Sequence, residues 1–178
     1  MEFKETSIFG CFELSPPVFE DLRGRLVKTF HRDTFIRYDL AADFEEEYYS
    51  VSHKGVLRGL HLQLPPFDHI KCVTSLHGKI FDAVVDLRWQ SPTFGKYYTT
   101  VLDSENGNML YVPAGCAHGF YALTDQVIFL NRTTTAFNPA VEAGIRWDSC
   151  GIPWPDANPI LSEKDNNLPA LSDFKNIL

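Results

Sequence analysis

The chain has 178 residues, enough for one domain with a full hydrophobic core, and its 44% apolar and 22% charged residues are ordinary for a globular protein. The formal net charge of −7, without a basic stripe, argues against a nucleic-acid partner. No segment approaches the ~20 apolar residues of a membrane span, and the N-terminus lacks a signal-peptide pattern. We therefore expect one cytoplasmic domain, with no membrane partner, that is an enzyme or a binding module.

The N-terminal residues 1–18 alternate loosely between apolar and polar side chains and predict an arm or edge strand, of a kind that often packs on a partner subunit. A turn at Ser15-Pro16-Pro17 closes this arm. Residues 19–26 predict a second turn that leads into a strand through Phe30. The acidic stretch 31–47 is the most helix-compatible part of the chain, and one small helix is expected there.

From Tyr48 to Phe137 the sequence consists almost wholly of strands and turns. Residues 78–88 are rich in β-branched and aromatic side chains, and further strands follow at 95–102, 109–112, 119–123 and 126–134. Strands spaced about every ten residues, without a long helical period, predict an all-β sandwich or barrel. The tail 138–178 contains five prolines and should wrap this single domain as loops and short helical turns.

The segment from Gly55 to Lys71 concentrates the residues that could do chemistry. His61 is a candidate base near neutral pH. Arg58 and Lys71 are costly to bury unless they meet an anion, so two cations beside a base predict an anionic substrate or an oxyanion formed during the reaction. Because successive side chains of a strand face opposite ways, a bend at Gly59 is needed to bring Arg58 and His61 into one cavity.

A second histidine, His118, follows a Pro-Gly turn in a PxGxxH pattern that also occurs in the second metal motif of cupins. Their first motif supplies HxH and a glutamate, whereas here Gln63 stands two residues after His61, and His69 and His77 would have to substitute. A metal-dependent cupin is therefore only a rival interpretation. The four cysteines lack CxxC spacing and are expected to be buried free thiols.

Six collinear blocks resemble the dTDP-4-dehydrorhamnose 3,5-epimerase (RmlC) family. They are GVLRGLHLQ at 55–63, the lysine at 71 before a strand that ends at Gly78, DLRWQSPTFGKY at 86–97, LYVPAGCAHGF at 110–120, GIRWD at 144–148 and PILSEKD at 159–165. FEDLRG at 19–24 is similar to the family's N-terminal segment. The resemblance implies a cupin-type jelly-roll β-sandwich that binds no metal or other cofactor, in a homodimer whose subunits exchange strands.

The same resemblance implies a role for each reactive side chain. His61 would be the base that removes a proton beside a 4-keto group, and Asp165, from the tail, would orient it. Lys71, with Arg58 and His118, would stabilise the enolate oxygen. This agrees with the independent argument that the two cations need an anion, because donors fixed where charge develops lower the barrier.

Other positions concern the nucleotide. Arg23 matches a family arginine that contacts the nucleotide diphosphate, often across the dimer, and Phe19 matches an aromatic residue near the base. Glu46, Tyr48 and Tyr49 stand where many dTDP-specific members have Gln and Asn-His. The resemblance therefore implies a nucleotide-diphosphate sugar substrate and leaves dTDP, GDP and CDP open.

One position departs from the family. Thirteen residues after His118, where the family has the tyrosine that returns a proton to the opposite face, this chain has Asn131. A carboxamide has no usable acidic proton. The proton could instead come from Tyr121 or Tyr48, or from water held by Asn131, or only one centre could be inverted. We favour inversion at one centre, and C3 over C5.

The sequence thus predicts an epimerase of a nucleotide-linked 4-keto-6-deoxy sugar. Rival interpretations are a full 3,5-epimerase with another acid, a sugar-nucleotide 3,4-ketoisomerase, which shares the jelly roll and enediolate chemistry, and a non-catalytic sugar-nucleotide binder. A pure binder has no need of His61, Asp165 and Lys71 together, so the catalytic interpretation is preferred.

Overall fold

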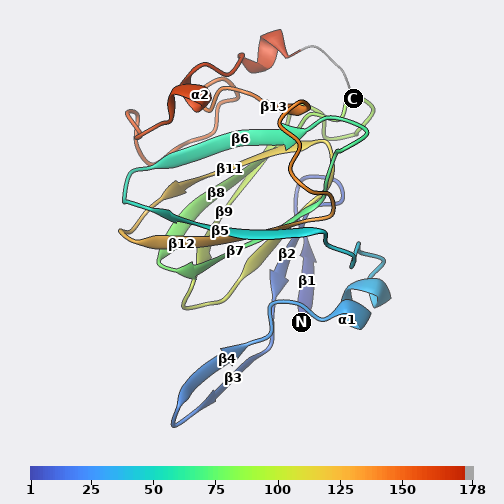
Figure 1. Cartoon of the computed structure of the whole chain (residues 1–178), viewed down its shortest axis with the longest axis vertical. Helices are drawn as coiled ribbons and strands as arrows, with labels where there is room; N and C mark the ends of the chain where they lie inside the picture. Colours follow the sequence, from blue (N-terminus) through green and yellow to red (C-terminus); the bar gives the residue numbers. More distant parts are fainter. Residues whose placement is uncertain (175–178) are drawn as a thin grey trace.

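Two antiparallel sheets face each other in a computed structural model that describes residues 1–174 (Figure 1). The first sheet runs in the order β1 (Glu2–Glu5), β2 (Phe12–Ser15), β10 (Met109–Val112), β7 (Lys71–His77), β12 (Val127–Thr133) and β5 (Glu46–Ser52). The second runs β13 (Glu142–Gly144), β6 (Leu57–Gln63), β11 (Cys116–Ala122), β8 (Lys79–Asp86) and β9 (Tyr97–Asp103). The predicted all-β jelly-roll sandwich is confirmed.

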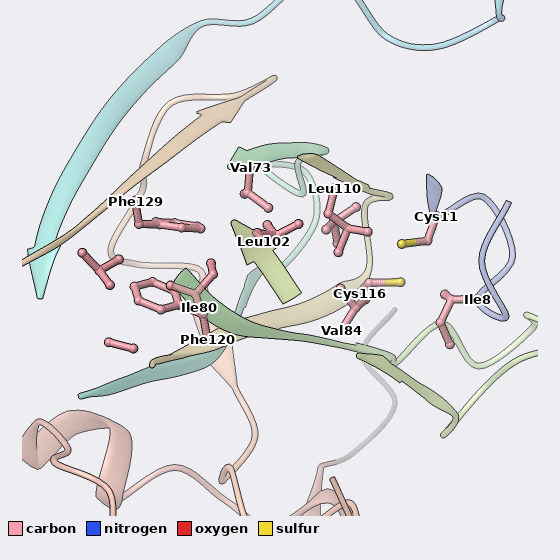
Figure 2. Packing of buried hydrophobic residues seen from close by; sticks show 13 residues of the cluster. Ile8, Cys11, Val73, Ile80, Val84, Leu102, Leu110, Cys116, Phe120 and Phe129 are labelled. Carbon is pink, nitrogen blue, oxygen red and sulfur yellow. The ribbon is translucent and has the colours of Figure 1, made fainter. Parts of the chain in front are cut away.

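The main core fills the space between the two sheets (Figure 2). Strand β8 explains how it forms, because alternate side chains of a strand point to opposite faces. Ile80 and Val84 enter the core between the sheets, whereas Ala83 and Val85 join a second apolar cluster that includes Ile145 and Ile152 of the tail. Both faces of β8 are therefore buried, which accounts for its nearly continuous apolar sequence.

The tail lies against the second sheet, where β13 pairs with β6. It also contains α2 (Glu163–Asn166) and the 3₁₀ turn η1 (Leu171–Asp173). Residues 175–178 of the predicted wrapping tail lie outside the described residues. No helix within residues 1–174 is long and apolar enough to cross a bilayer.

The N-terminal region differs from the single arm strand that we predicted for residues 1–18. It contributes two strands, β1 and β2, and β2 pairs with β10 inside the first sheet. The turn and following strand expected over residues 19–30 are present as a turn at Leu22-Arg23 and β4 (Gly24–Val27). The strand before the turn, β3 (Val18–Asp21), was not predicted, and it pairs with β4 in a hairpin that projects from the body (Figure 1). The predicted small helix is present as α1 (Arg32–Arg37), but β5 begins at Glu46, before the predicted start of the strands at Tyr48.

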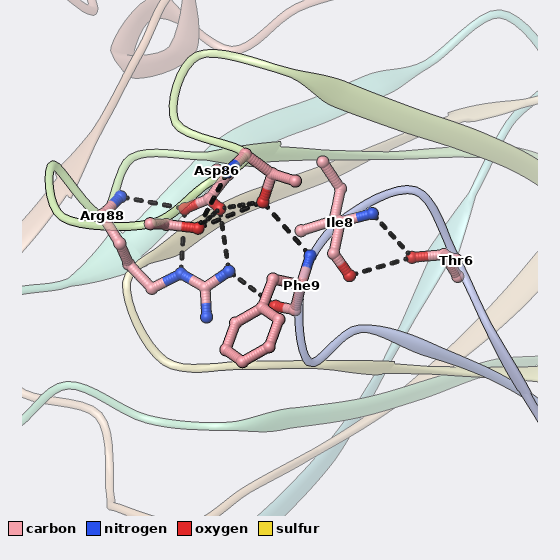
Figure 3. Close-up of polar contacts among 7 residues, drawn as sticks. Thr6, Ile8, Phe9, Asp86 and Arg88 are labelled. Carbon is pink, nitrogen blue, oxygen red and sulfur yellow. Dashed lines mark hydrogen bonds and ion pairs between the residues drawn. The ribbon is translucent and has the colours of Figure 1, made fainter.

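A buried carboxylate ties the N-terminal loop to the turn after β8 (Figure 3). Asp86 accepts hydrogen bonds from Arg88 Nε at 2.8 Å and from Thr93 Oγ1 at 2.6 Å. Arg88 also donates to the carbonyl of Phe9 at 2.7 Å, and the Phe9 amide donates to Thr93 Oγ1 at 3.1 Å. The N-terminal loop and residues 86–93 are thus joined through one buried carboxylate and its partners, and we expect the cluster to stabilise the edge of the sandwich.

Candidate active site

A cavity of about 610 Å³ lies between the two sheets at the end covered by β13 and α2. Its walls come from β5, β7 and β12 of the first sheet and from β6 and β11 of the second. Most of the site residues predicted from the sequence line it, namely Glu46, Arg58, His61, Lys71, His118, Asn131 and Asp165. Phe19 and Arg23 do not.

An irregularity in β6 brings two of these residues into the same cavity. His61 is opposite His118 and Arg58 is opposite Phe120, so β6 has one more residue than β11 in this interval. The extra residue forms a bulge, which re-aims the side chains around it. Gly59 has φ +125°, and a Cβ there would lie 2.5 Å from Cα of Gly119. The bend that the sequence analysis required is therefore present, and only glycine fits it.

His61 is paired with the carboxylate of Asp165, at 2.7 Å between Nε2 and Oδ1. The other carboxylate oxygen accepts the amide hydrogen of Gly59 at 3.2 Å. Burial alone would raise the pKa of Asp165, but the hydrogen bonds and charge of its partners, His61 above all, hold it below the usual value. An ionised carboxylate accepts the Nε2 hydrogen and so leaves the lone pair on Nδ1 of His61. His61 keeps a quarter of its side chain exposed, as contact with a substrate requires.

Asp165 reaches His61 because the tail docks on the start of β6. The amide of Leu57 donates to the carbonyl of Ile160 at 2.9 Å, and the amide of Ile160 donates to the carbonyl of Gly55 at 2.8 Å. Ser162 then caps α2 by accepting the Asp165 amide hydrogen at 3.1 Å. Backbone hydrogen bonds and the Ser162 cap, a common residue type at a helix N-terminus, therefore fix the position of the carboxylate.

Lys71 is buried beside the base and donates from Nζ to the backbone carbonyl of His61 at 2.8 Å. Burial lowers its pKa to about 8, although the nearby carboxylates of Asp82 and Glu142 oppose the shift. The same surroundings lower the pKa of His69 to about 4, through burial and the charge of Lys71. Lys71 thus carries its charge at neutral pH, whereas the neighbouring imidazole stays neutral.

His118 has a carboxylate partner, Asp82, that was not predicted from the sequence. Its Nε2 lies 2.9 Å from Oδ2 of Asp82, both side chains are buried, and the imidazole stacks on Phe129 with ring centroids 5.8 Å apart. Asp82 stands in β8 two residues from Ile80 and from Val84, on the face that points into the core. A carboxylate on the apolar face of a predicted strand was the available signal, since such a group is rarely buried without a partner.

Asn131 meets a phenol in the cavity. Its Nδ2 donates to the hydroxyl oxygen of Tyr48 at 2.7 Å, and the two residues are direct partners across β12 and β5. Tyr48 lines the cavity, and among the described residues it is the only tyrosine that does. Tyr121, the other tyrosine considered from the sequence, instead lies 3.5 Å from a carboxylate oxygen of Asp156.

The remaining predicted residues lie at the periphery. Arg58 donates to Ser52 Oγ at 3.0 Å, and Glu46 accepts the amide hydrogen of Phe137 at 2.7 Å. Phe19 and Arg23 lie on the projecting hairpin, where Arg23 pairs with Asp21. Both side chains are exposed, so within one subunit they are separate from the cavity.

The metal interpretation required His69 and His77 to join His61. His77 lies exposed at the end of β7 and does not line the cavity. His69 is within 3.2 Å of the Gln63 amide nitrogen. Within residues 1–174, no group of three or more His, Cys, Asp and Glu side chains has an arrangement suited to a metal ion.

Comparisons with known proteins identify the family of this chain. Residues 5–173 match the family described as dTDP-4-dehydrorhamnose 3,5-epimerase. A relative of that name from Shigella flexneri is 40% identical over 170 residues, which cover 94% of each chain. The crystal structure of the Bacillus anthracis enzyme of that name, with TDP and PPi bound, has a TM-score of 0.93 and 33% identity and covers 96% of this chain and 99% of that one.

A third similar protein has a narrower activity. ChmJ, a 3′-monoepimerase from Streptomyces bikiniensis crystallised with dTDP-quinovose, has a TM-score of 0.90 and 32% identity and covers 95% of this chain and 87% of that one. Fold, cavity and similarity together define the chain as an isomerase of the carbohydrate epimerase class. It belongs to the dTDP-4-dehydrorhamnose 3,5-epimerase family, as the resemblance of its motifs predicted.

Proposed function

We propose that the chain epimerises a nucleotide-linked 4-keto-6-deoxy sugar at one carbon beside the ketone, C3. The observation that carries this proposal is the pairing of His61 with Asp165 beside the buried ammonium of Lys71. A proton on a carbon beside a ketone is weakly acidic, and its removal needs both a positioned base and a cation near the enolate oxygen. The cavity supplies both.

In this mechanism Nδ1 of His61 takes the C3 proton, and the C–H electron pair moves into the C3–C4 bond while the ketone oxygen becomes an enolate. Lys71, with Arg58 and His118, stabilises that oxygen. Asp165 stabilises the imidazolium that forms on His61, and Asp82 fixes the orientation of the His118 ring through Nε2. Return of a proton to the opposite face of C3 restores the ketone and inverts the centre.

Inversion at C3 alone is favoured by Asn131, which cannot act as an acid, so any returned proton must come from a differently placed group that need not reach both carbons. The similarity to ChmJ, a 3′-monoepimerase, supports the proposal that this fold can invert C3 without inverting C5. Since TDP and dTDP-quinovose occupy the structures of similar proteins, we propose dTDP over GDP and CDP as the nucleotide of the substrate. The four cysteines are free, which suits the reducing conditions of the cytoplasm, the compartment that we propose.

The proposed assembly is a homodimer. The β3–β4 hairpin exposes Phe19, Leu22 and Leu26 on a ribbon that, among the described residues, pairs with no third strand (Figure 1). An isolated two-stranded hairpin is at best marginally stable in water. We propose that the hairpin lies on the partner subunit and carries Phe19 and Arg23 to the nucleotide end of the partner's cavity.

The test is incubation with dTDP-, GDP- and CDP-linked 4-keto-6-deoxyglucose in D₂O, followed by NMR of the sugar. Deuterium at C3 with an inverted product is expected. Deuterium at C5 alone or at both carbons would refute the C3 assignment and indicate a 5- or 3,5-epimerase, and movement of the ketone to C3 would indicate a ketoisomerase.

The control variant is His61→Asn, which should abolish exchange. Exchange that persisted in this variant would disprove the assignment of the base, and no exchange by the unmodified protein with any of the three substrates would leave a sugar-nucleotide binder. Metal analysis of the purified protein, with a chelator control on the exchange rate, tests the metal-dependent cupin.

A further inference from the structure

We infer that Tyr48 is the acid that returns the proton, with its phenol positioned by Asn131. This inference rests on the proposed epimerisation and names the group that completes it. Asn131 and Tyr48 are opposite each other on neighbouring strands, and their side chains meet inside the cavity at 2.7 Å.

The position of the phenol suits delivery to the opposite face. His61 projects from β6 in the second sheet, whereas Tyr48 projects from β5 in the first sheet. Both side chains line the cavity, so they face a bound sugar from opposite walls. A base on one wall and an acid on the other is the arrangement that inversion requires, because the proton leaves one face of the carbon and enters the other.

The hydrogen bond also leaves the phenol ready to donate. The amide nitrogen of Asn131 donates to the phenol oxygen, so the hydroxyl hydrogen of Tyr48 is not used in this contact. Burial raises the pKa of Tyr48 above its ordinary value, with a further contribution from the charges of Glu46 and Glu142, while Asn131 opposes the shift. The phenol therefore holds its proton at neutral pH.

Three other proton-bearing groups of the cavity, Lys71, Lys164 and His69, are engaged elsewhere or carry no proton to give. Lys71 donates to the His61 carbonyl, and Lys164 donates to Glu142 at 2.7 Å. His69 has a pKa of about 4 because of its burial and of the charge on Lys71, so it carries no extra proton at pH 7. Among the described residues that line the cavity, Tyr48 is the phenol available.

The proton balance closes without a further reactant. His61 Nδ1 gains the proton from C3 and becomes an imidazolium, and the enolate carbon takes the hydroxyl proton of Tyr48 as the C4 carbonyl re-forms. The enzyme is left with an imidazolium and a phenolate. Nearly half of Tyr48 is exposed, so water can return its proton while His61 loses one, and the net reaction is an isomerisation.

The test compares Tyr48→Phe with the unmodified protein in the D₂O experiment, scoring deuterium at C3 separately in retained and in inverted sugar. We expect the variant to invert C3 roughly 100-fold more slowly, which is the usual contribution of a general acid. Exchange with retention should continue, because His61 can still remove the proton and return a deuteron to the same face. An inversion rate within about threefold of the unmodified protein would overturn the inference.

The matched control is Tyr49→Phe, since Tyr49 is the next residue of β5, is more exposed and does not line the cavity. It should invert C3 at the normal rate, and equal melting temperatures of the two variants would show that Tyr48→Phe remains folded. Loss of both exchange and inversion in Tyr48→Phe, with the fold intact, would refute a role limited to proton return. Absence of exchange in the unmodified protein would overturn the proposed function itself, and the acid assignment with it.

Discussion

At the scale of single residues, Lys71 links the chemistry to pH. Its burial lowers the pKa to about 8, so the ammonium is present below that pH and is lost as the pH rises through it. If the ammonium stabilises the enolate, kcat/KM should fall on the alkaline side of about pH 8, since this ratio reports the free enzyme. A pH series of initial inversion rates measures this.

Substitution identifies the group responsible for this alkaline fall. Lys71→Met should lower kcat/KM by roughly 100-fold and remove the fall between pH 7 and about 9, because no ammonium is left to titrate. Lys79→Met is the control, since Lys79 is half-exposed and pairs with Asp103 on β9 at 2.8 Å, outside the cavity. An alkaline fall that survives in Lys71→Met would assign it to a different group.

The candidate site could be predicted only in part from single residues. Arg58, His61 and Lys71 lie within one short segment, so a bend at Gly59 was enough to predict that they share a cavity. The contact between Tyr48 and Asn131 could not be predicted in the same way, because their pairing depends on the register of β5 and β12, whose residues are 83 positions apart. Asp82 was missed for a related reason, since its partner lies on another strand.

At the scale of elements, the Asp86 cluster should decide the stability of the N-terminal loop. Asp86→Ala leaves the guanidinium of Arg88 and two hydroxyls without their acceptor, so we expect the free energy of unfolding to fall by roughly 3 kcal/mol. Chemical denaturation followed by tryptophan fluorescence measures this change. A loss smaller than about 1 kcal/mol would mean that the cluster behaves as a surface ion pair.

An exposed ion pair elsewhere in the chain supplies the control, and the Asp86 contacts set the pH dependence. Asp43→Ala breaks an exposed pair with Arg32 at 2.9 Å and should lower the free energy of unfolding by less than about 1 kcal/mol.

Burial alone would raise the pKa of Asp86, but hydrogen bonds from Arg88, Ser91 and Thr93 hold it below the usual value. The stabilisation is therefore present above about pH 4 and is lost as the pH falls further, so Asp86→Ala and the unmodified protein should converge in acid.

The elements themselves were predictable where the pattern was long. The run of β-branched and aromatic residues at 78–88 corresponds to β8, and the Pro-Gly turn before His118 precedes β11. Strand β3 and its pairing with β4 were missed because both strands have four residues and, within residues 1–174, no buried face that imposes an alternation. The two strands pair with each other and not with the main sheets, so no pattern of buried and exposed side chains marks their register in the sequence.

At the scale of the whole molecule, the projecting hairpin allows a test of the dimer. If Arg23 acts in the partner's cavity, a mixed dimer of Arg23→Ala and His61→Asn subunits contains one site with both native residues. Each variant alone should be weak or inactive, whereas co-expression should restore about a quarter of the normal activity, from the statistics of random pairing in a two-fold dimer. No restoration, with mixed dimers shown by differential tags, would mean that each hairpin serves its own subunit.

The docking of the tail makes the orientation of His61 depend on a segment that can open locally. The walls of the cavity belong to the sandwich, but the carboxylate that orients His61 arrives on a segment held by the backbone bonds between Ile160 and residues 55–57. Local opening of that segment would leave the sandwich folded but His61 without its carboxylate partner, and therefore inactive. This open state differs from the active one by the loss of a few hydrogen bonds. Amide exchange at Leu57 and Ile160 measures its population. Exchange there by global unfolding alone would rule such a state out.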